Sequence, residues 1–252
     1  MASPKISIIT VTFNAELYLE PTIQSVISQN FESLEYIVVD GNSSDRTMDI
    51  IDKYHDKIDT LIRETDHGVY DAMNKGLKLA KGEYVLFLNA GDELASDKTL
   101  EKIFKQVSNP DLIYGETLII DINRKTIGTR TNLTSRKLPE ALSKRDFLNG
   151  QVVSHQSFIP KRSLCPQYDL QYRCSADIDW MLRIMSKVNF IHKSEESISK
   201  YLQGGISDRN LKTCWMERLN IMLKHFNPIV VMIKHIEFGI RYLRIGAYKN
   251  KP

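Results

Sequence analysis

Short runs of buried-type residues alternate with segments of helical periodicity through the first half of the chain. We expect strands over Ile6–Val11, Tyr36–Val39, 58–63 and Tyr84–Leu88. We expect helices from Leu19 to Ile27, over about 45–55 and from Gly68 to Ala80. This order predicts an α/β fold with a mostly parallel, right-handed sheet and helices on both faces. Such a sheet binds ligands at the carboxyl ends of its strands.

After residue 110 the pattern changes to shorter apolar runs. These predict short strands, in mixed or antiparallel pairing, over 112–114, 118–120 and 126–129. Further helices are expected near 137–145 and from Asp177 to Met185. Because no repeat or low-complexity linker interrupts the chain, we expect one domain over residues 1–205, with halves 1–110 and 111–205, followed by a helical tail over 206–252.

Composition limits the class of protein. The chain has 252 residues and is 42% hydrophobic, which is enough for a substantial core. Its three cysteines have no metal-binding or disulfide spacing, which indicates a reducing compartment. The N-terminus leads straight into a strand without a signal-peptide pattern. We therefore expect a cytoplasmic protein.

The charge is concentrated in the tail. Residues 209–252 carry nine basic and two acidic residues, a net of +7, whereas residues 1–208 carry 25 and 29, a net of −4. Lys234, Glu237, Arg241 and Arg244 form one charged stripe on a predicted helix over 229–248, with apolar residues on much of the rest. A basic amphipathic helix is typical of an anionic membrane surface, and we expect that rather than nucleic acid. Packing on the domain or on a partner subunit is an equal alternative.

Polar residues stand at the ends of the predicted strands. Thr12 and Phe13 end the first, Asp40 ends the second, and Asn89 to Asp92 follow the fourth. No Walker-type loop and no Gly-x-Gly-x-x-Gly is present, so a phosphate group must be held otherwise. Strand-end acids with a divalent cation are the obvious substitute. The alternatives are that Asp40 caps a helix and that Asp92 is a turn residue.

Five stretches of the chain carry a family resemblance. They are Ser7–Asn14, Val38–Thr47, Asp66–Gly76, Gly82–Asp92 and Ala176–Arg183. In this order the chain resembles a family 2 glycosyltransferase of the GT-A fold, of the bacterial polysaccharide type. The resemblance implies a Rossmann-like sheet, a nucleotide-binding half over 1–110 and an acceptor half over 111–205.

The resemblance also implies roles on the donor side. Thr12 and Phe13 are expected near the nucleotide base, and Asp40 at the base or ribose. The residues expected to line the nucleotide-sugar and its diphosphate are Asp66, Asn74, Lys75, Asn89 and Gly91.

Catalysis is expected from two carboxylates. Asp92 resembles the metal-binding aspartate of the family's Asp-x-Asp element, with Mg²⁺ or Mn²⁺ as the cofactor. Asp177 resembles the catalytic base. Asn89 and Gly91 stand where many members carry acids, as does Gly41 after the second strand. Asp92 is therefore expected to hold the cation together with the donor diphosphate.

Other residues are candidate contacts to the acceptor or the donor sugar. His155 lies in an element that is near both sugars in similar proteins, although a lone histidine is more often structural. Asp179 is the rival of Asp177 for the role of base. Trp180 could stack on a sugar ring, but an aromatic residue on a helix is more often part of the core.

Together these features predict an inverting, metal-dependent glycosyltransferase. The expected donor is a UDP-linked sugar. The acceptor is expected to be a saccharide or lipid-linked saccharide in bacterial polysaccharide synthesis, reached at the inner face of the cell membrane. The alternatives are a sugar nucleotidyltransferase and a non-catalytic subunit that binds nucleotide-sugars. The oligomeric state is not predicted.

Overall fold

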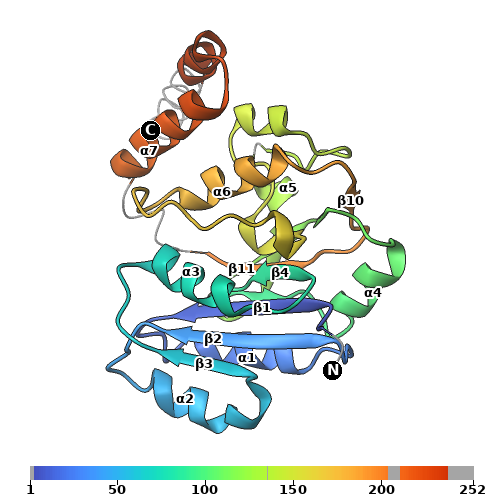
Figure 1. Ribbon diagram of the computed structural model, residues 1–252, viewed down its shortest axis with the longest axis vertical. Helices are drawn as coiled ribbons and strands as arrows, with labels where there is room; N and C mark the ends of the chain where they lie inside the picture. Colours follow the sequence, from blue (N-terminus) through green and yellow to red (C-terminus); the bar gives the residue numbers. More distant parts are fainter. Residues whose placement is uncertain (1–2, 135, 204–210, 238–252) are drawn as a thin grey trace, which may run out of the picture.

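A parallel sheet forms the centre of the molecule (Figure 1). The computed structural model describes residues 3–134, 136–203 and 211–237. The strand order is β3-β2-β1-β4, and all neighbours are parallel. The bounds are Ile6–Thr12 for β1, Leu34–Asp40 for β2, Thr60–Arg63 for β3 and Tyr84–Phe87 for β4. The predicted parallel sheet is confirmed.

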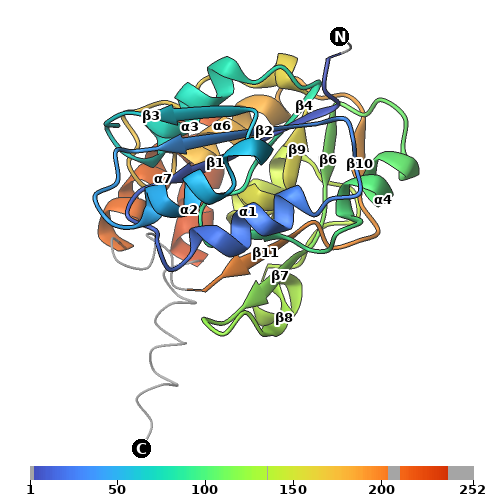
Figure 2. The same ribbon diagram turned by 90° about the horizontal axis from the view of Figure 1, so that it is seen from below.

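Helices cover both faces of this sheet, as expected (Figures 1 and 2). Because side chains alternate along a strand, Ile6 and Ile8 of β1 belong to the core cluster on one face, and Ile9 and Val11 to the cluster on the other. The first cluster is covered by α1 and α2, and the second by α3. These elements, with a short 3₁₀ helix η1, span Leu19–Ile27 (α1), Thr47–Lys53 (α2), His55–Lys57 (η1) and Val69–Leu79 (α3).

Beyond the central sheet, short strands pair in mixed directions, which confirms the second prediction. One sheet has the order β10-β6-β9 and another β5-β11-β7-β8, each with parallel and antiparallel neighbours. The strands are Glu93–Leu94 (β5), Leu112–Tyr114 (β6), Thr117–Ile120 (β7), Thr126–Thr129 (β8), Phe158–Pro160 (β9), Ile191–Lys193 (β10) and Ser199–Leu202 (β11). The helices among them are Thr99–Gln106 (α4), Arg130–Leu133 (α5), Arg162–Leu164 (η4) and Ala176–Met185 (α6).

The helix predicted near 137–145 is wrong. Residues 136–143 are irregular, and a 3₁₀ helix η2 follows over Lys144–Asn149. The Pro139 and Glu140 carbonyls accept hydrogen bonds from the Tyr114 hydroxyl at 2.9 and 3.0 Å, so a contact with β6 replaces helical hydrogen bonding. A capping box between Ser143 and Asp146 then starts η2.

The C-terminal helices pack on α6. Helix α7 spans Leu211–His225, and residues 228–237 are also helical. Ile221, Met222 and Val231 are buried in the core cluster that contains α6. No helix among the described residues is long and apolar enough to cross a membrane. The helix predicted over 229–248 lies partly outside the described residues, and the domain boundary near 205 stays a prediction.

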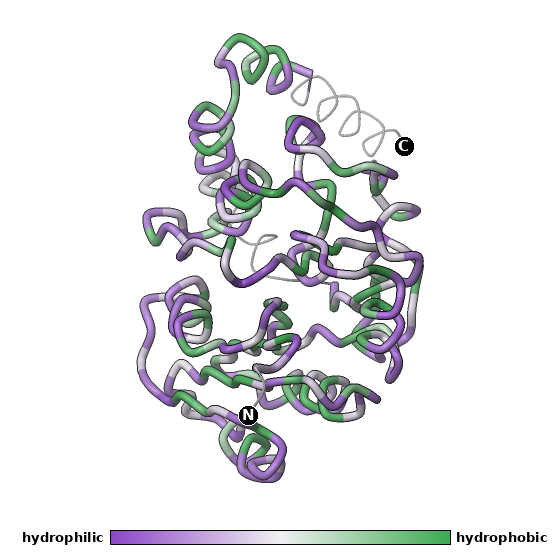
Figure 3. The backbone as a smooth tube through the Cα atoms, turned by 45° about the vertical axis from the view of Figure 1, so that its right-hand side comes forward, coloured by the Kyte–Doolittle hydropathy of each residue, from purple (hydrophilic) through white to green (hydrophobic). Residues whose placement is uncertain are grey.

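Apolar and polar stretches alternate along the backbone, and apolar residues are also found in the outermost helical segment near the C-terminal end of the described residues (Figure 3).

Candidate active site

The carboxyl ends of β1, β2 and β4 lie side by side at one edge of the central sheet. Thr12 is the register partner of Asp40. On the other side of β1, the Ala90 amide donates to the Val11 carbonyl oxygen at 3.2 Å, which brings Asn89 beside the same strand end. The structure therefore brings together the strand-end residues that the sequence singled out.

Two buried polar atoms at this edge lack a partner. Among the described residues, neither Thr12 Oγ1 nor Asn89 Oδ1 has a hydrogen bond. Leaving a buried polar atom unpaired costs about 1–3 kcal/mol, so such atoms are rare. A ligand that offers polar atoms at this edge would satisfy both.

The structure explains why glycine stands at position 41, where many family members carry an acidic residue. A Cβ atom at this position would lie 2.4 Å from Asp66 Oδ2 and 3.2 Å from Phe13 Cδ2. The Asp66 carboxylate therefore fills the space into which a side chain at position 41 would extend. Phe13 is 61% exposed beside it and offers a ring face to a ligand.

Asp40 organises the turn after β2. Its carboxylate accepts hydrogen bonds from the Ser43 amide at 2.9 Å and from the Ser43 hydroxyl at 2.5 Å, and Arg63 Nε lies 3.8 Å away. The side chain is fully buried. These contacts belong to a turn rather than to a cap of α2, and a contact with the ribose or base stays a prediction.

Asn74 and Lys75 use their polar atoms within the protein. Asn74 Oδ1 accepts from the Tyr168 amide at 2.7 Å, and its Nδ2 donates to the Tyr168 carbonyl at 3.0 Å. Lys75 Nζ lies 3.1 Å from Glu64 Oε1 and 3.6 Å from Asp71 Oδ2. The expectation that both residues line the diphosphate therefore stays a prediction.

The turn that carries Asp92 is fixed from several sides. Gly91 has a φ of +107°, which favours glycine. Its amide donates to Thr22 Oγ1 at 2.9 Å, and its carbonyl accepts from Arg124 at 2.8 Å. Arg124, on the β7–β8 hairpin, also donates to Glu93 Oε1 at 3.0 Å. A strand end, a helix and a distant hairpin therefore hold this loop.

The Asp92 carboxyl group is buried and held by a neutral amide. Gln156 Nε2 donates to Asp92 Oδ2 at 2.8 Å. Burial is the main cause that raises the pKa of Asp92 to about 7, against the opposing effects of the Gln156 hydrogen bond, a backbone hydrogen bond from Leu202 and the Arg124 charge. A bound cation would therefore stabilise the ionised form of this carboxyl group.

The described residues do not form a cluster of side chains that could bind a metal ion without further ligands. Among the described residues, no group of three or more His, Cys, Asp or Glu side chains could hold a metal ion. A cation that takes one carboxylate oxygen here and its other ligands from phosphates and water fits, because Mg²⁺ is often held in this way. Asp92 is the residue that would hold it.

Asp177 lies in the first turn of α6. Its Oδ1 accepts from the Tyr70 hydroxyl at 3.2 Å, and its Oδ2 from Gln151 Nε2 at 3.0 Å. The N-cap residue of α6 is Ser175. The Asp177 carboxylate is therefore held by side chains from two other segments and does not cap the helix.

Asp179 points to a different neighbourhood. It is fully buried, with Arg183 Nε at 2.7 Å, His225 Nε2 at 2.8 Å and Lys224 Nζ at 3.3 Å. Burial acts to raise the pKa of Asp179, but the His225 hydrogen bond and the two cations outweigh it and hold the pKa below its usual value. This residue ties α6 to α7, and we assign it no catalytic role.

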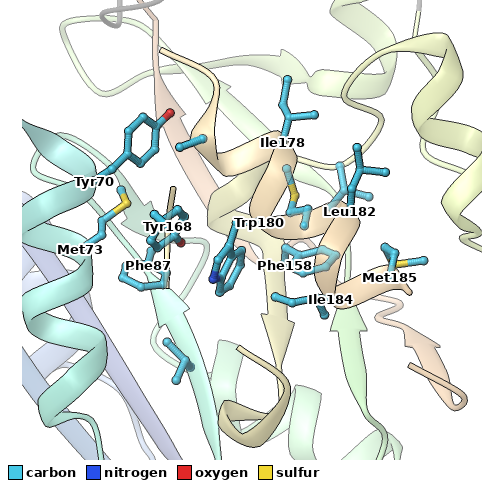
Figure 4. Close-up of a cluster of buried hydrophobic side chains, with 14 of the residues drawn as sticks. Tyr70, Met73, Phe87, Phe158, Tyr168, Ile178, Trp180, Leu182, Ile184 and Met185 are labelled. Atoms are coloured by element: carbon cyan, nitrogen blue, oxygen red, sulfur yellow. The ribbon is translucent and has the colours of Figure 1, made fainter. Parts of the chain in front are cut away.

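An aromatic cluster lies between α3 and α6 (Figure 4). Trp180 is fully buried, stacks on Tyr168 with ring centroids 5.0 Å apart, and donates its indole N–H to the Pro166 carbonyl at 2.8 Å. Trp180 is therefore part of the hydrophobic core, which is the alternative to stacking on a sugar ring. His155 Nε2 lies 2.7 Å from the Tyr168 hydroxyl, and burial lowers the pKa of His155 to about 4. The imidazole is therefore neutral, and its contact with a sugar stays a prediction.

Sequence reasoning missed four side chains of this site: Tyr70, Arg124, Gln151 and Gln156. Gln156 had a signal, because it directly follows His155, a candidate sugar contact. Tyr70 also had a signal, because it lies within the matching stretch Asp66–Gly76. Arg124 and Gln151 make their contacts across long stretches of chain, and no local pattern marks such contacts.

Sequence comparisons identify related proteins. The family model described as glycosyl transferase family 2 matches residues 7–168. A PGL/p-HBAD biosynthesis glycosyltransferase of Mycobacterium bovis (strain BCG / Pasteur 1173P2) is 32% identical over 92% of this chain and 91% of its own. The GalNAc(5)-diNAcBac-PP-undecaprenol beta-1,3-glucosyltransferase of Campylobacter jejuni is 30% identical over 76% of this chain and 63% of its own.

Solved structures share the fold. S. aureus TarS 1-349 in complex with UDP has a TM-score of 0.68 at 19% identity, covering 95% of this chain and 72% of that one. Mannosyltransferase PcManGT from Pyrobaculum calidifontis, in complex with GDP-Man and Mn2+, has a TM-score of 0.62 at 18% identity, covering 94% and 70%. The expected GT-A fold is confirmed.

Proposed function

The chain belongs to glycosyl transferase family 2, and from this premise we propose that it transfers a sugar, with inversion, from a nucleotide-diphospho-sugar to an acceptor hydroxyl. The observation that carries the proposal is the pair of separately held carboxylates, Asp92 at the end of β4 and Asp177 at the start of α6. One is suited to the leaving group and the other to the attacking hydroxyl.

The donor is proposed to lie along the carboxyl ends of β1, β2 and β4. The unpartnered Thr12 Oγ1 and Asn89 Oδ1 support a polar ligand there, and the exposed ring of Phe13 supports a planar base. Asp40, Asp66, Asn74, Lys75 and Gly91 complete the proposed donor side. We propose UDP as the nucleotide, because S. aureus TarS, which shares the fold, has been solved in complex with UDP.

Asp92 is proposed to hold Mg²⁺ or Mn²⁺ together with the donor diphosphate. Its carboxylate is buried and has no ion pair among the described residues, and the mannosyltransferase of the same fold is in complex with Mn²⁺. When bound, such a cation neutralises the charge that develops on a leaving diphosphate.

Asp177 is proposed to accept the proton of the acceptor hydroxyl as it attacks the anomeric carbon. A single displacement inverts the configuration and requires only one base. Tyr70 and Gln151 each occupy one lone pair of the Asp177 carboxylate, and a carboxylate has further lone pairs for an acceptor.

The acceptor is proposed to be a lipid-linked saccharide of bacterial polysaccharide synthesis, reached from the cytoplasm at the membrane surface. The name of the Campylobacter relative describes a polyprenyl-linked acceptor. The exposed isoleucines of residues 228–237 and the basic tail support a membrane contact. His155 is kept as a proposed neighbour of the sugars.

A panel of nucleotide-sugars tests the proposal, with a membrane extract as acceptor and Mn²⁺ present or chelated. We expect metal-dependent transfer from one donor, and loss of transfer in Asp92→Asn and in Asp177→Asn. Full transfer in either variant would contradict the assigned roles. Metal-dependent nucleotide binding without transfer to any acceptor would instead identify a non-catalytic subunit.

A further inference from the structure

One short segment of the chain contacts both proposed catalytic carboxylates. Gln151 Nε2 donates to Asp177 Oδ2 at 3.0 Å, and Gln156 Nε2 donates to Asp92 Oδ2 at 2.8 Å. Asp92 and Asp177 come from distant parts of the sequence, whereas the two glutamines are five residues apart. Gln151 lies just after η2, and Gln156 lies in the short 3₁₀ helix His155–Ser157 (η3) that precedes β9. The same kind of group therefore holds each carboxylate.

We propose that Gln151 and Gln156 are positioning residues with separate tasks. Gln156 orients Asp92 for binding of the cation and the donor diphosphate, and Gln151 orients Asp177 for proton transfer from the acceptor. This inference rests on the proposed function.

A neutral amide is the donor that both tasks require. A cation beside a carboxylate lowers its affinity for a proton and competes with a metal ion for its charge. An amide N–H fixes one oxygen without adding a charge and leaves the carboxylate its other lone pairs. Among the described residues neither Asp92 nor Asp177 has an ion pair, whereas Asp179, which has a structural role, has cations on it.

The segment is anchored at both ends. Arg130 donates to the Val152 carbonyl at 2.8 Å and to the Gln151 carbonyl. At the other end, Ser157 Oγ lies 2.7 Å from Thr117 Oγ1 and 2.7 Å from Ser199 Oγ. These contacts fix the segment and so give the side-chain amides of Gln151 and Gln156 a defined position. A residue that orients a catalytic group needs such support.

The two tasks are separated by the variants Gln156→Met and Gln151→Met, which remove the donor at similar side-chain length. Calorimetry uses MnCl₂ and the nucleoside diphosphate, among UDP, GDP, ADP and CDP, that the unsubstituted protein binds most tightly. We expect Gln156→Met to weaken metal-dependent binding about tenfold, the loss of roughly one hydrogen bond to a charged group. We expect the affinity of Gln151→Met for the nucleoside diphosphate and Mn²⁺ to stay within about twofold of that of the unsubstituted protein. Its partner, Asp177, is proposed to act on the acceptor and not to contact the nucleotide-sugar.

Steady-state transfer supplies the second readout. We expect Gln151→Met to lower kcat about tenfold with the KM for the donor unchanged, and Gln156→Met to raise the KM for the donor and for Mn²⁺. A merely structural role for the segment would not divide the effects in this way.

The control is Gln171→Met, because Gln171 is an exposed glutamine that donates to the Asp169 carboxylate. It should change neither binding nor kcat. If a methionine variant does not fold, Gln156→Leu and Gln151→Leu remove the same donor with a shorter neutral side chain, and the same division is expected.

The inference is overturned if the two glutamine variants change the same quantity equally, or if both behave like Gln171→Met. That outcome is distinct from failure of the proposed function. Inactive Asp92→Asn and Asp177→Asn beside unaffected glutamine variants would remove only the positioning roles, whereas fully active aspartate variants would remove the catalytic roles themselves.

Discussion

Asp92 is a carboxyl group that the fold has removed from water without an ion pair among the described residues, and the nearby Arg124 charge only partly offsets its burial. Burial raises its pKa to about 7, against an unfolded value of about 3.9. Between these values the folded protein holds a proton that the unfolded chain has released. Stability from this group is therefore present at low pH and lost as the pH rises toward the folded pKa. Asp92 thus makes the protein less stable at neutral pH in return for a site that attracts a cation.

Asp92→Asn should remove this pH dependence. We expect the variant, free of metal and nucleotide, to be more stable than the unsubstituted protein at pH 8 by about 1–3 kcal/mol. At pH 5 the difference should be smaller. Urea unfolding in EDTA at the two pH values measures both quantities, and parallel pH profiles would show that Asp92 is not a buried, pKa-raised carboxyl group.

Asp179→Ala should change stability rather than nucleotide binding. The substitution leaves Arg183, Lys224 and His225 without their buried partner, and breaking such an arrangement costs about 3 kcal/mol. Because the pKa of Asp179 is lowered, its stabilisation is present above the unfolded pKa and lost as the pH falls through the folded pKa. Urea unfolding at neutral pH and calorimetry with a nucleoside diphosphate and Mn²⁺ test this. Unchanged stability together with lost nucleotide binding would contradict it.

Among the helices and strands, the hydrophobic pattern predicted those elements whose position depends on burial of their own side chains. The strands β1, β2 and β4 read as apolar runs because both of their faces are covered. The false helix near 137–145 shows the limit, because the Tyr114 hydroxyl from a distant strand holds the carbonyls of Pro139 and Glu140.

The candidate site divides in the same way. Asp40 and Asp92 stand at strand ends, which a sequence reveals. The partners Gln151 and Gln156 reach their carboxylates through the tertiary fold, and their amides look like any polar loop residue in the sequence.

The β7–β8 hairpin should matter for donor binding although it lies apart from the central sheet (Figure 2). Arg124 from this hairpin donates to the Gly91 carbonyl beside Asp92. We expect Arg124→Met to weaken metal-dependent nucleotide binding about tenfold, since a hydrogen bond to a charged group contributes about 1.5–3 kcal/mol.

Arg162→Met is the matched control for the hairpin. Arg162 Nε donates to the Gly82 carbonyl at 2.9 Å, ahead of β4 and at the opposite end of the sheet. It should leave calorimetric affinity unchanged. Equal losses in the two variants would show that any arginine–carbonyl contact of this fold has the same effect.

At the scale of the whole molecule, a mildly acidic body carries a basic C-terminal segment. Residues 228–237 bury Val231 against the core and leave Ile229, Ile233 and Ile236 exposed by 72, 52 and 60%. One side of this helix therefore packs on the protein, while other residues remain for a second contact. The alternative of packing on the domain describes Val231, and the membrane contact stays a prediction.

Replacing these isoleucines tests the membrane contact. We expect the unsubstituted protein to sediment with vesicles of phosphatidylglycerol and phosphatidylcholine more than with phosphatidylcholine alone, and less at high salt. Ile229→Gln, Ile233→Gln and Ile236→Gln together should lower that binding at least about fivefold, through loss of buried apolar area. Ile122→Gln, at an exposed isoleucine near the β7–β8 hairpin, is the control. Equal vesicle binding by the triple variant and the control would favour a protein partner for this surface.

In the proposed mechanism Asp92 serves the donor and Asp177 the acceptor. Calorimetry with the best-bound nucleoside diphosphate and Mn²⁺, paired with sugar transfer on the same protein samples, tests it most directly. Asp92→Asn should lose metal-dependent nucleotide binding and transfer together. Asp177→Asn should bind nucleotide and Mn²⁺ as the unsubstituted protein does and lose transfer by about two to four orders of magnitude, as expected for the loss of a general base. Transfer at the normal rate by Asp177→Asn, or unchanged metal-dependent binding by Asp92→Asn, would contradict the account.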